Sequence, residues 1–426
     1  MTKHQIEKLS NGLRVVTRRM EDNDSVTIGF YVGAGGRYED MTTEYGAAHF
    51  LEHLLFKGTT KRPSAKIIAE EVDSVGGLMN AYTTEDHTAY YIKLPKQHFA
   101  LAFDILSDIL TDPLFDPDEI ERERGVILEE MNVYKDDPAR FVFDLVGDLL
   151  WPEDTLRTNV IGTAEIITGM QRSTIADYYK SLYTVDNMVV SVAGNVEHAD
   201  VVAAAQAKLG ELQTKASRGY EHIKGGISDQ RSNIVNQDTN QVHMVVCARG
   251  AILESEDEAP MRVMSAILGG GMSSRLFLNV RERKGLAYTI YSTGNGFVDS
   301  GKFEIYAGVN KDKAEQALVA IGEELKKIID EPVPSAELQK AVEQVKGRMI
   351  MGLENNFSVA DDMGTDLILT GKIWTLEQML RKIDAVTAAD VARVAQNYLA
   401  KDNLRLAMIG PFDDSAKAKY EKLITQ

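Results

Sequence analysis

The chain carries one pattern twice, and the two copies lie 216 residues apart. A turn at Asp186 leads into an apolar run that stops at Gly194, and a turn at Asp402 leads into a similar run that stops at Gly410. The offset is the same at both ends, because 402 − 186 = 216 and 410 − 194 = 216. Each copy is typical of a turn, a buried strand and a glycine stop. A repeat over so long a distance indicates two similar structural units in one chain.

Other segments recur in the same order at nearly the same distance. The apolar run 26–35 corresponds to the run 242–251, since 242 − 26 = 216. Three further pairs are a predicted strand (89–94 and 303–309), a predicted helix (97–110 and 313–328), and the prolines before a long helix (Pro117 and Pro334). Five coincidences in order favour a duplication over chance.

The repeat predicts an α+β fold made of two homologous domains. Strands that follow one another through short turns favour mainly antiparallel sheets, each with helices packed on one face. We expect the first domain at residues 1–214, a polar, turn-rich linker at 215–232 and the second domain at 233–426. The total of 426 residues suits such a division.

Charge and composition exclude several classes of function. The formal net charge is −17 and the pI about 5.0, so nucleic acid and anionic membranes are poor partners, whereas basic peptides are attracted. No apolar run approaches the ~18 residues that a membrane helix needs, and the polar segment 1–12 lacks the apolar core of a signal peptide. We therefore expect a cytoplasmic protein. The single cysteine, Cys247, is expected to be a buried strand residue.

A pair of histidines with metal-ligand spacing stands near the N-terminus. His49 and His53 are four residues apart in a segment, 46–59, that is predicted to be helical, so both imidazoles lie on one face. Two such rings can share one zinc ion. Glu52 lies beside them and is placed to accept a proton from water. The alternative is a pair of ordinary histidines on a helix face, and only a third ligand would decide against it.

An acidic run from Asp116 to Glu130 supplies that ligand. Asp116 can cap a helix that starts at Pro117. Glu123 and Glu130 are seven residues apart on an apolar face that should point inward, where a carboxylate requires a metal or a cation. We therefore predict Glu130 as the ligand and Glu123 as support for a ligating histidine. Glu129 is turned about 100° away and is expected to be solvated. A merely charged surface helix remains the alternative.

These motifs resemble the M16 family of metallopeptidases, the inverzincins. The family motif is His-x-x-Glu-His with a glutamate ligand about 77 residues further on, and here 130 − 53 = 77. The resemblance covers essentially the whole chain and is strongest to half-size bacterial processing peptidases that dimerise. It implies one zinc per chain, held by His49, His53 and Glu130 with Glu52 as general base. Ligand type alone leaves Mn²⁺ and Co²⁺ open.

The resemblance also assigns substrate-binding residues. It implies that Asn80 and Ala81 lie on an edge strand to which a peptide adds, that Arg281 holds substrate carbonyls and that Tyr288 donates to the oxyanion. From the residues alone, Asn80 is a turn residue, Arg281 is solvated and Tyr288 is a half-buried strand residue. The second half has no His-x-x-Glu-His, so only the first domain should bind zinc.

The expected function is zinc-dependent endopeptidase activity on unfolded peptides or precursor segments. A homodimer would form a closed chamber, with Arg281 and Tyr288 of one chain acting on the zinc site of the other. Two alternatives stay open at this point: a non-catalytic scaffold like the core subunits of respiratory complexes, and one subunit of a heterodimeric peptidase.

Overall fold

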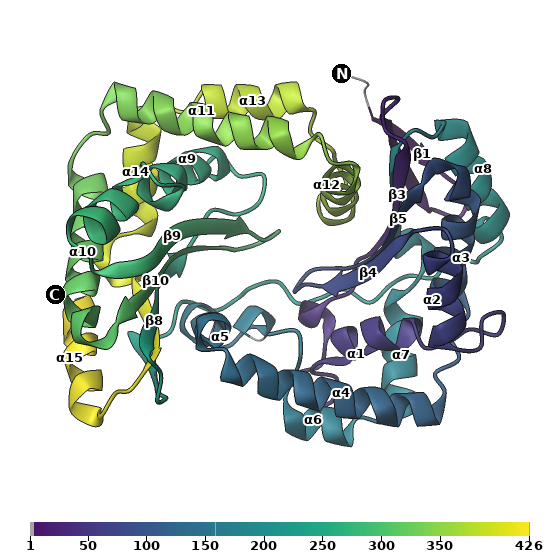
Figure 1. Cartoon of the computed structure of the whole chain (residues 1–426), viewed down its shortest axis with the longest axis horizontal. Helices are drawn as coiled ribbons and strands as arrows, with labels where there is room; N and C mark the ends of the chain where they lie inside the picture. Colours follow the sequence, from purple (N-terminus) through teal and green to yellow (C-terminus); the bar gives the residue numbers. More distant parts are fainter. Residues whose placement is uncertain (1–3, 158, 426) are drawn as a thin grey trace. The chain divides into compact units, whose positions relative to one another are not determined.

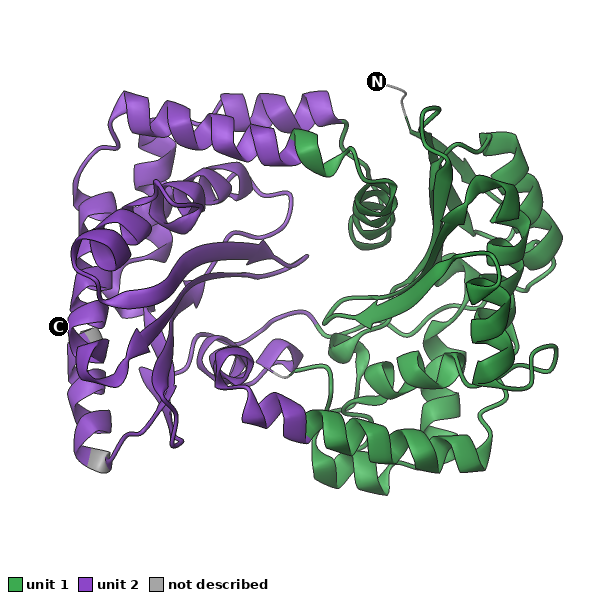
Figure 2. Cartoon of the chain, viewed as in Figure 1, with its two compact units in different colours: residues 1–131, 159–221, 350–375 green, residues 132–158, 222–349, 376–426 purple. Residues whose placement is uncertain are grey.

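The computed structural model describes residues 4–157 and 159–425, and it divides into two compact units. Residues 1–3, 158 and 426, which the predicted domains include, lie outside the described part. The units are discontinuous in sequence, as Figure 2 shows by colour. Unit 1 consists of residues 1–131, 159–221 and 350–375, and unit 2 of residues 132–158, 222–349 and 376–426. This division by contact differs from the linear boundaries at 214 and 233, which stay a prediction about the duplication.

Unit 1 is built on a six-stranded sheet with strand order β1-β2-β6-β3-β5-β4. Figure 1 labels β1, β3, β5 and β4 of this sheet. All neighbouring strands are antiparallel except the pair β2 and β6. The strands are β1 (Gln5–Lys8), β2 (Arg14–Arg19), β3 (Ser25–Val32), β4 (Leu78–Thr83), β5 (Thr88–Pro95) and β6 (Met188–Gly194). β3 and β6 are buried almost throughout, because both faces of the sheet are covered.

Helices cover both faces of this sheet. On one face Phe30 of β3 meets Phe103 of α3, with ring centroids 5.5 Å apart. The next residue, Tyr31, points to the opposite face and donates its hydroxyl to Asp361 of α12 (3.1 Å). The helices of this unit are α1 (Ala47–Leu55), α2 (Ala65–Asp73), α3 (Phe99–Thr111), most of α4 (Pro117–Asp136), α6 (Ala164–Gly169), α7 (Arg172–Leu182), α8 (His198–Leu209) and α12 (Asn356–Leu369).

Unit 2 repeats the plan with a five-stranded sheet of order β7-β11-β8-β10-β9. Only the pair β7 and β11 is parallel. The strands are β7 (Ser232–Asn236), β8 (Gln241–Arg249), β9 (Ala287–Gly296), β10 (Gly301–Asn310) and β11 (Arg405–Gly410). β3 and β8 take equivalent places in the two sheets, as do β6 and β11, so the duplication seen in sequence is present in the fold.

The second sheet is also covered on both faces. One face packs against α9, α10 and α14, and the other against α5. Cys247 of β8 is fully buried on the α5 side, among Val146 and Leu149, as its apolar context predicts. The helices are α5 (Pro138–Leu150), α9 (Glu258–Gly269), the π-helical turn η5 (Phe277–Arg283), α10 (Ala314–Asp330), α11 (Ser335–Gly352), α13 (Leu376–Asp384), α14 (Ala388–Tyr398) and α15 (Asp414–Thr425).

The predicted α+β class and duplication are confirmed, and the structure adds an exchange of helices. α5 belongs to the first half of the sequence but packs on the second sheet, whereas α12 belongs to the second half and packs on the first. They are repeat equivalents, because 356 − 138 = 218. Helices on one face of each sheet were predicted; the exchanged helix on the other face was not. Among the helices of residues 4–157 and 159–425, none is both long enough and apolar enough to cross a membrane.

Candidate metal centre and peptide-binding strand

The helix that carries the histidines, α1, starts at a buried cap. Gly46 precedes it with φ +95°, a left-handed conformation that glycine adopts without strain. The buried carboxyl group of Glu39 accepts the backbone N–H of Gly46 (2.9 Å) and of Ala48 (2.7 Å). Burial raises the pKa of Glu39 to about 8, an effect that the two N–H donors oppose. Glu39 thus satisfies backbone donors that the first turn of a helix leaves free.

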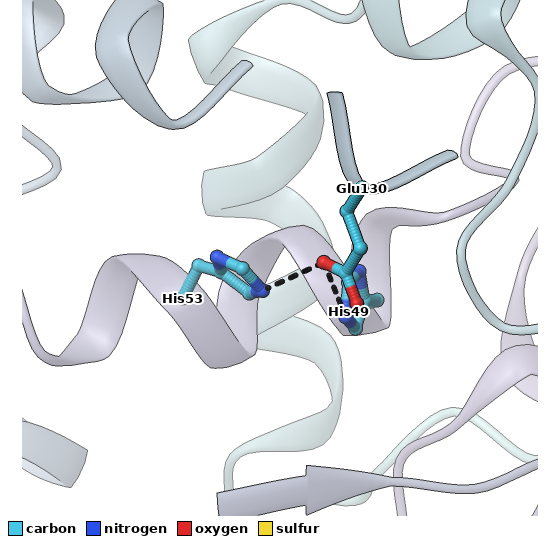
Figure 3. Close-up of side chains that lie close together, drawn as sticks. All are labelled: His49, His53 and Glu130. Atoms are coloured by element: carbon cyan, nitrogen blue, oxygen red, sulfur yellow. Dashed lines mark ion pairs between the residues drawn. The ribbon is translucent and has the colours of Figure 1, made fainter. Parts of the chain in front are cut away.

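His49, His53 and Glu130 lie together, as Figure 3 shows. Glu130 Oε2 is 3.8 Å from His49 Nε2 and 3.7 Å from His53 Nε2. The two imidazole rings stand 4.7 Å apart between centroids, one helical turn from each other on α1. One ligand atom from each of the three residues lies within 4.8 Å of the others. Two nitrogens and one oxygen therefore converge on a single point from α1 and α4.

Glu123 orients His53 toward that point. His53 Nδ1 donates to Glu123 Oε2 (3.1 Å), which leaves the lone pair of Nε2 directed at Glu130. The other oxygen of Glu123 accepts from Lys57 Nζ (2.7 Å). Only 7% of the Glu123 side chain is exposed, so this pairing takes place in a largely dry environment. A carboxylate behind a histidine is the usual support for a metal ligand.

The three residues fit a zinc ion by donor type and spacing. Zinc binds imidazole nitrogen and carboxylate oxygen at about 2.0–2.2 Å in a tetrahedral arrangement, which puts ligand atoms roughly 3.3 Å apart. The two spacings to Glu130, 3.7 and 3.8 Å, are within a small side-chain adjustment of that value, and all three ligand atoms lie within 4.8 Å of one another. Burial, and then the neighbouring His53, lowers the pKa of His49 to about 3. The neutral imidazole, which is the form that binds metal, is thereby favoured.

Glu52 lies beside this cluster and contacts β4. Thr83 Oγ1 donates to Glu52 Oε2 (2.5 Å). Burial raises the pKa of Glu52, whereas the hydrogen bond from Thr83 and the proximity of His53 lower it. A carboxylate with a raised pKa is better suited to accept and return a proton near neutral pH.

β4 forms the edge of the first sheet and carries Asn80 and Ala81. Within the described residues it pairs with β5 alone, so its other side offers backbone groups to an added strand. Ala81 and Thr83 point to the α1 side, and Ala81 is 8% exposed. The Asn80 side chain is exposed, and its Oδ1 accepts the N–H of Ala81 (2.9 Å). Asn80 is thus a strand residue, and the reading of it as a turn residue is wrong.

α4 places its acidic residues largely as expected. Asp116 Oδ1 accepts the N–H of Asp118 (2.9 Å) and of Glu119 (3.2 Å), which is the predicted cap. Glu129 is exposed, whereas Glu123 is buried. The face of α4 between Glu123 and Glu130 is less buried than predicted, because Val126 is 48% exposed.

Arg281 and Tyr288 lie together in unit 2, outside the unit that holds the histidines. Arg281 belongs to the π-helical turn η5, and its guanidinium carbon is 4.6 Å from the ring centroid of Phe277 and 5.9 Å from that of Tyr288. Gly285, with φ +58°, ends this turn and leads into β9. Tyr288 on the edge strand β9 is 75% exposed, so the expectation of a half-buried side chain is wrong.

Three contacts of the site were not predicted. Lys57 is four residues after His53, just beyond the end of α1 at Leu55, and this spacing at a helix end could have indicated its approach to Glu123. Thr83 is two residues after Ala81 and shares its strand face, which could have placed it near Glu52. Glu39 has no signal of this kind, because it reaches α1 from a loop.

Comparison with known proteins identifies the group to which the chain is related. The family described as Insulinase (Peptidase family M16) matches residues 14–164, and the Peptidase M16 inactive domain matches residues 169–345. An uncharacterized zinc protease of Streptomyces coelicolor is 35% identical over 98% of this chain and 91% of its own length. The chain belongs to peptidase family M16. The uncharacterized zinc protease YmxG of Bacillus subtilis, 33% identical over 94% of this chain and 97% of its own length, is a further relative.

Solved structures agree with this assignment at the level of the fold. A protease from Helicobacter pylori superimposes with a TM-score of 0.90 at 23% identity, covering 96% of this chain and 100% of that one. A peptidase M16 inactive domain from Pseudomonas fluorescens gives 0.87 at 18% identity, covering 96% and 98%. The M16 motif His49-x-x-Glu52-His53 lies in the first matched region, and Arg281 and Tyr288 lie in the second.

Proposed function

We propose that this M16 family member is a zinc endopeptidase with one metal centre per chain. The observation that carries the proposal is the convergence of His49, His53 and Glu130, with Glu52 beside them and an edge strand adjoining Glu52. Within residues 4–157 and 159–425, this is the one cluster of three potential ligands. The names of the relatives, which call them zinc proteases, support the choice of metal.

The chain's own residues supply a proton path. Glu52 accepts a proton from the attacking water and later returns it to the leaving amine, so that one carboxylate acts as base and then as acid. Thr83 keeps Glu52 at the edge strand through their hydrogen bond. Zinc, when bound, supplies a positive charge that polarises the peptide carbonyl and lowers the pKa of water.

The substrate in this proposal is an unfolded peptide that extends β4. The backbone of an added strand would bind the free edge near Asn80 and Ala81. The net charge of −17 favours peptides with basic residues. Arg281 would bind substrate carbonyls, and Tyr288 would donate to the oxyanion, a contact typically worth about 3 kcal/mol to the transition state. Their mutual contact and the exposure of Tyr288 support a shared role in binding.

The first test is cleavage of a quenched fluorescent peptide rich in lysine and arginine, with chelator and then with zinc. We expect activity to disappear and return. Glu52→Gln should retain zinc and lose at least 100-fold in turnover, the usual contribution of a general base. Glu129→Gln, an exposed change on α4 with the same loss of charge, is the matched control. A zinc-loaded Glu52→Gln protein that cleaves at the native rate would rule out this assignment.

We further propose a homodimeric chamber in which Arg281 and Tyr288 act on the partner's zinc site. Mixing Glu52→Gln chains with Tyr288→Phe chains tests it, because a mixed dimer contains one site with both intact groups. Partial return of activity is expected. If neither variant gains activity on mixing although mixed dimers form, the two groups act within one chain or not at all.

A further inference from the structure

β4, the strand proposed to bind substrate, contacts α12, a helix from the second half of the sequence, on the face opposite α1. Its Tyr82 points away from α1, opposite to Thr83, and donates its hydroxyl to Asp361 Oδ1 of α12 (2.5 Å). The same carboxylate oxygen accepts from Tyr31 of β3 (3.1 Å). Asp361 lies outside both matched family regions, which end at residue 345.

This contact belongs to a partly buried polar network, whose Tyr82, Asp361 and Thr365 side chains are half-buried. His87 Nε2 lies 3.3 Å from the Tyr82 hydroxyl and 3.4 Å from Thr365 Oγ1, also on α12. The Tyr82 and His87 rings meet edge to face at 5.6 Å. Burial, and then the charge of Asp361, raises the pKa of Tyr82, so its phenol remains a donor. A hydrogen bond to a carboxylate in such surroundings is stronger than one in water.

α12 is closely docked and therefore a firm anchor. A Cβ atom at Gly364 would come within 2.2 Å of the Tyr31 ring, so the helix lies too close to the sheet for any residue other than glycine at this position. Ser191 of β6 donates to the Ala360 carbonyl (2.7 Å), and Arg14 of β2 donates to the Leu367 carbonyl (2.8 Å). The helix is thus attached to β2, β3 and β6, which form the interior of the sheet. β4, by contrast, is an edge strand that pairs with β5 on one side and, within residues 4–157 and 159–425, with no strand on the other.

Adjacent residues of β4 face in opposite directions and connect two parts of the site. Thr83 binds Glu52, and Tyr82 binds Asp361. We propose that Asp361 is a positioning residue for peptide binding: through Tyr82 it fixes the edge strand, and hence Thr83 and Glu52, in the geometry that an added substrate strand requires. This inference rests on the proposed peptidase function. It gives the exchanged helix α12 a role in substrate binding.

The experiment compares Tyr82→Phe with Tyr31→Phe in the full-length, zinc-loaded protein. Each variant removes one phenolic hydroxyl from the same oxygen of Asp361, but only Tyr82 lies on the edge strand. We expect Tyr82→Phe to weaken binding of a basic test peptide by about tenfold, since a hydrogen bond to a charged group is lost. Tyr31→Phe should change binding less than twofold. Peptide Kd is measured in the Glu52→Gln background, and KM and kcat in the background with Glu52 intact.

Hydrogen exchange of the β4 amides provides a readout that needs no activity. Tyr82→Phe should speed the exchange of these amides, whereas Tyr31→Phe should leave it unchanged. The zinc affinity of both variants should equal that of the unmodified protein. Asp361→Leu, which removes the acceptor while keeping the approximate shape, should match Tyr82→Phe. Equal effects of Tyr82→Phe and Tyr31→Phe, or unaltered exchange in β4, would overturn the inference. If the protein with Tyr82 intact binds no peptide, the proposed function fails, and the exchange data still decide whether Asp361 anchors β4.

Discussion

Glu123 offers a measurable test of how the proposed metal centre is supported. Its two oxygens serve two partners, His53 Nδ1 at 3.1 Å and Lys57 Nζ at 2.7 Å, and only 7% of its side chain is exposed. In Glu123→Gln one of the two oxygens is replaced by an NH₂ group, which is a donor. Since His53 Nδ1 and Lys57 Nζ are also donors, one of the two hydrogen bonds is lost. Loss of a supporting carboxylate typically weakens metal binding 10- to 100-fold. We expect about tenfold for Glu123→Gln and about a hundredfold for Glu123→Ala, or roughly 1.4 and 2.8 kcal/mol.

Zinc affinity is measured by competition with a chromogenic chelator at fixed pH. Glu129→Gln is the control, because it lies on the same helix and removes the same charge from an exposed position. Unfolding curves for the apo proteins separate loss of metal affinity from loss of fold. If Glu123→Gln binds zinc as tightly as Glu129→Gln, the hydrogen bond to His53 does not support the metal, and the reasoning is refuted.

Three further outcomes are expected. Glu39→Ala should lower the free energy of unfolding by about 2–4 kcal/mol in urea titrations, because the N–H groups of Gly46 and Ala48 lose their acceptor at a buried helix start; a change below 0.5 kcal/mol would contradict this. Burial lowers the pKa of His87 from 6.5 to about 4. The neutral ring therefore makes its whole contribution to the free energy of unfolding above pH 6.5, and up to roughly 3 kcal/mol of it is lost as the pH falls to 4. His87→Gln should reduce this pH dependence in urea titrations at pH 7 and 4.5. Burial raises the pKa of the Cys247 thiol, and a thiol reagent should label it only in the unfolded protein; rapid labelling of the folded protein would show that β8 is accessible.

The sequence predicts the parts of this protein that depend on local spacing. The interval from His49 to His53 places two rings on one face of α1, and Asp116 marks the start of α4, because caps and helical periodicity act over a few residues. The 216-residue offset predicts equivalent strands in both sheets, since β3 and β8 bury similar apolar runs.

The exchange of helices could not be predicted in this way. α5 and α12 both have an apolar face, but periodicity states only that such a face is buried and not which sheet buries it. The contact of Asp361 could not be predicted from the sequence for the same reason, because its partner Tyr82 is 279 residues away. The exposure of Val126 and Tyr288 also depends on tertiary packing rather than on neighbouring residues.

The exchanged helix has a consequence for synthesis on the ribosome. The last strand of the first sheet ends at Gly194, and α12, which covers one of its faces, ends at Leu369, so 369 − 194 = 175 residues separate them. At roughly 5–20 residues per second, translation of that stretch takes about 10–35 s. Throughout this interval the apolar residues that later contact α12, among them Val16, Tyr31 and Val189, have no native cover. We therefore expect the nascent first half to depend on chaperones, and expression of residues 1–214 alone to give aggregated material.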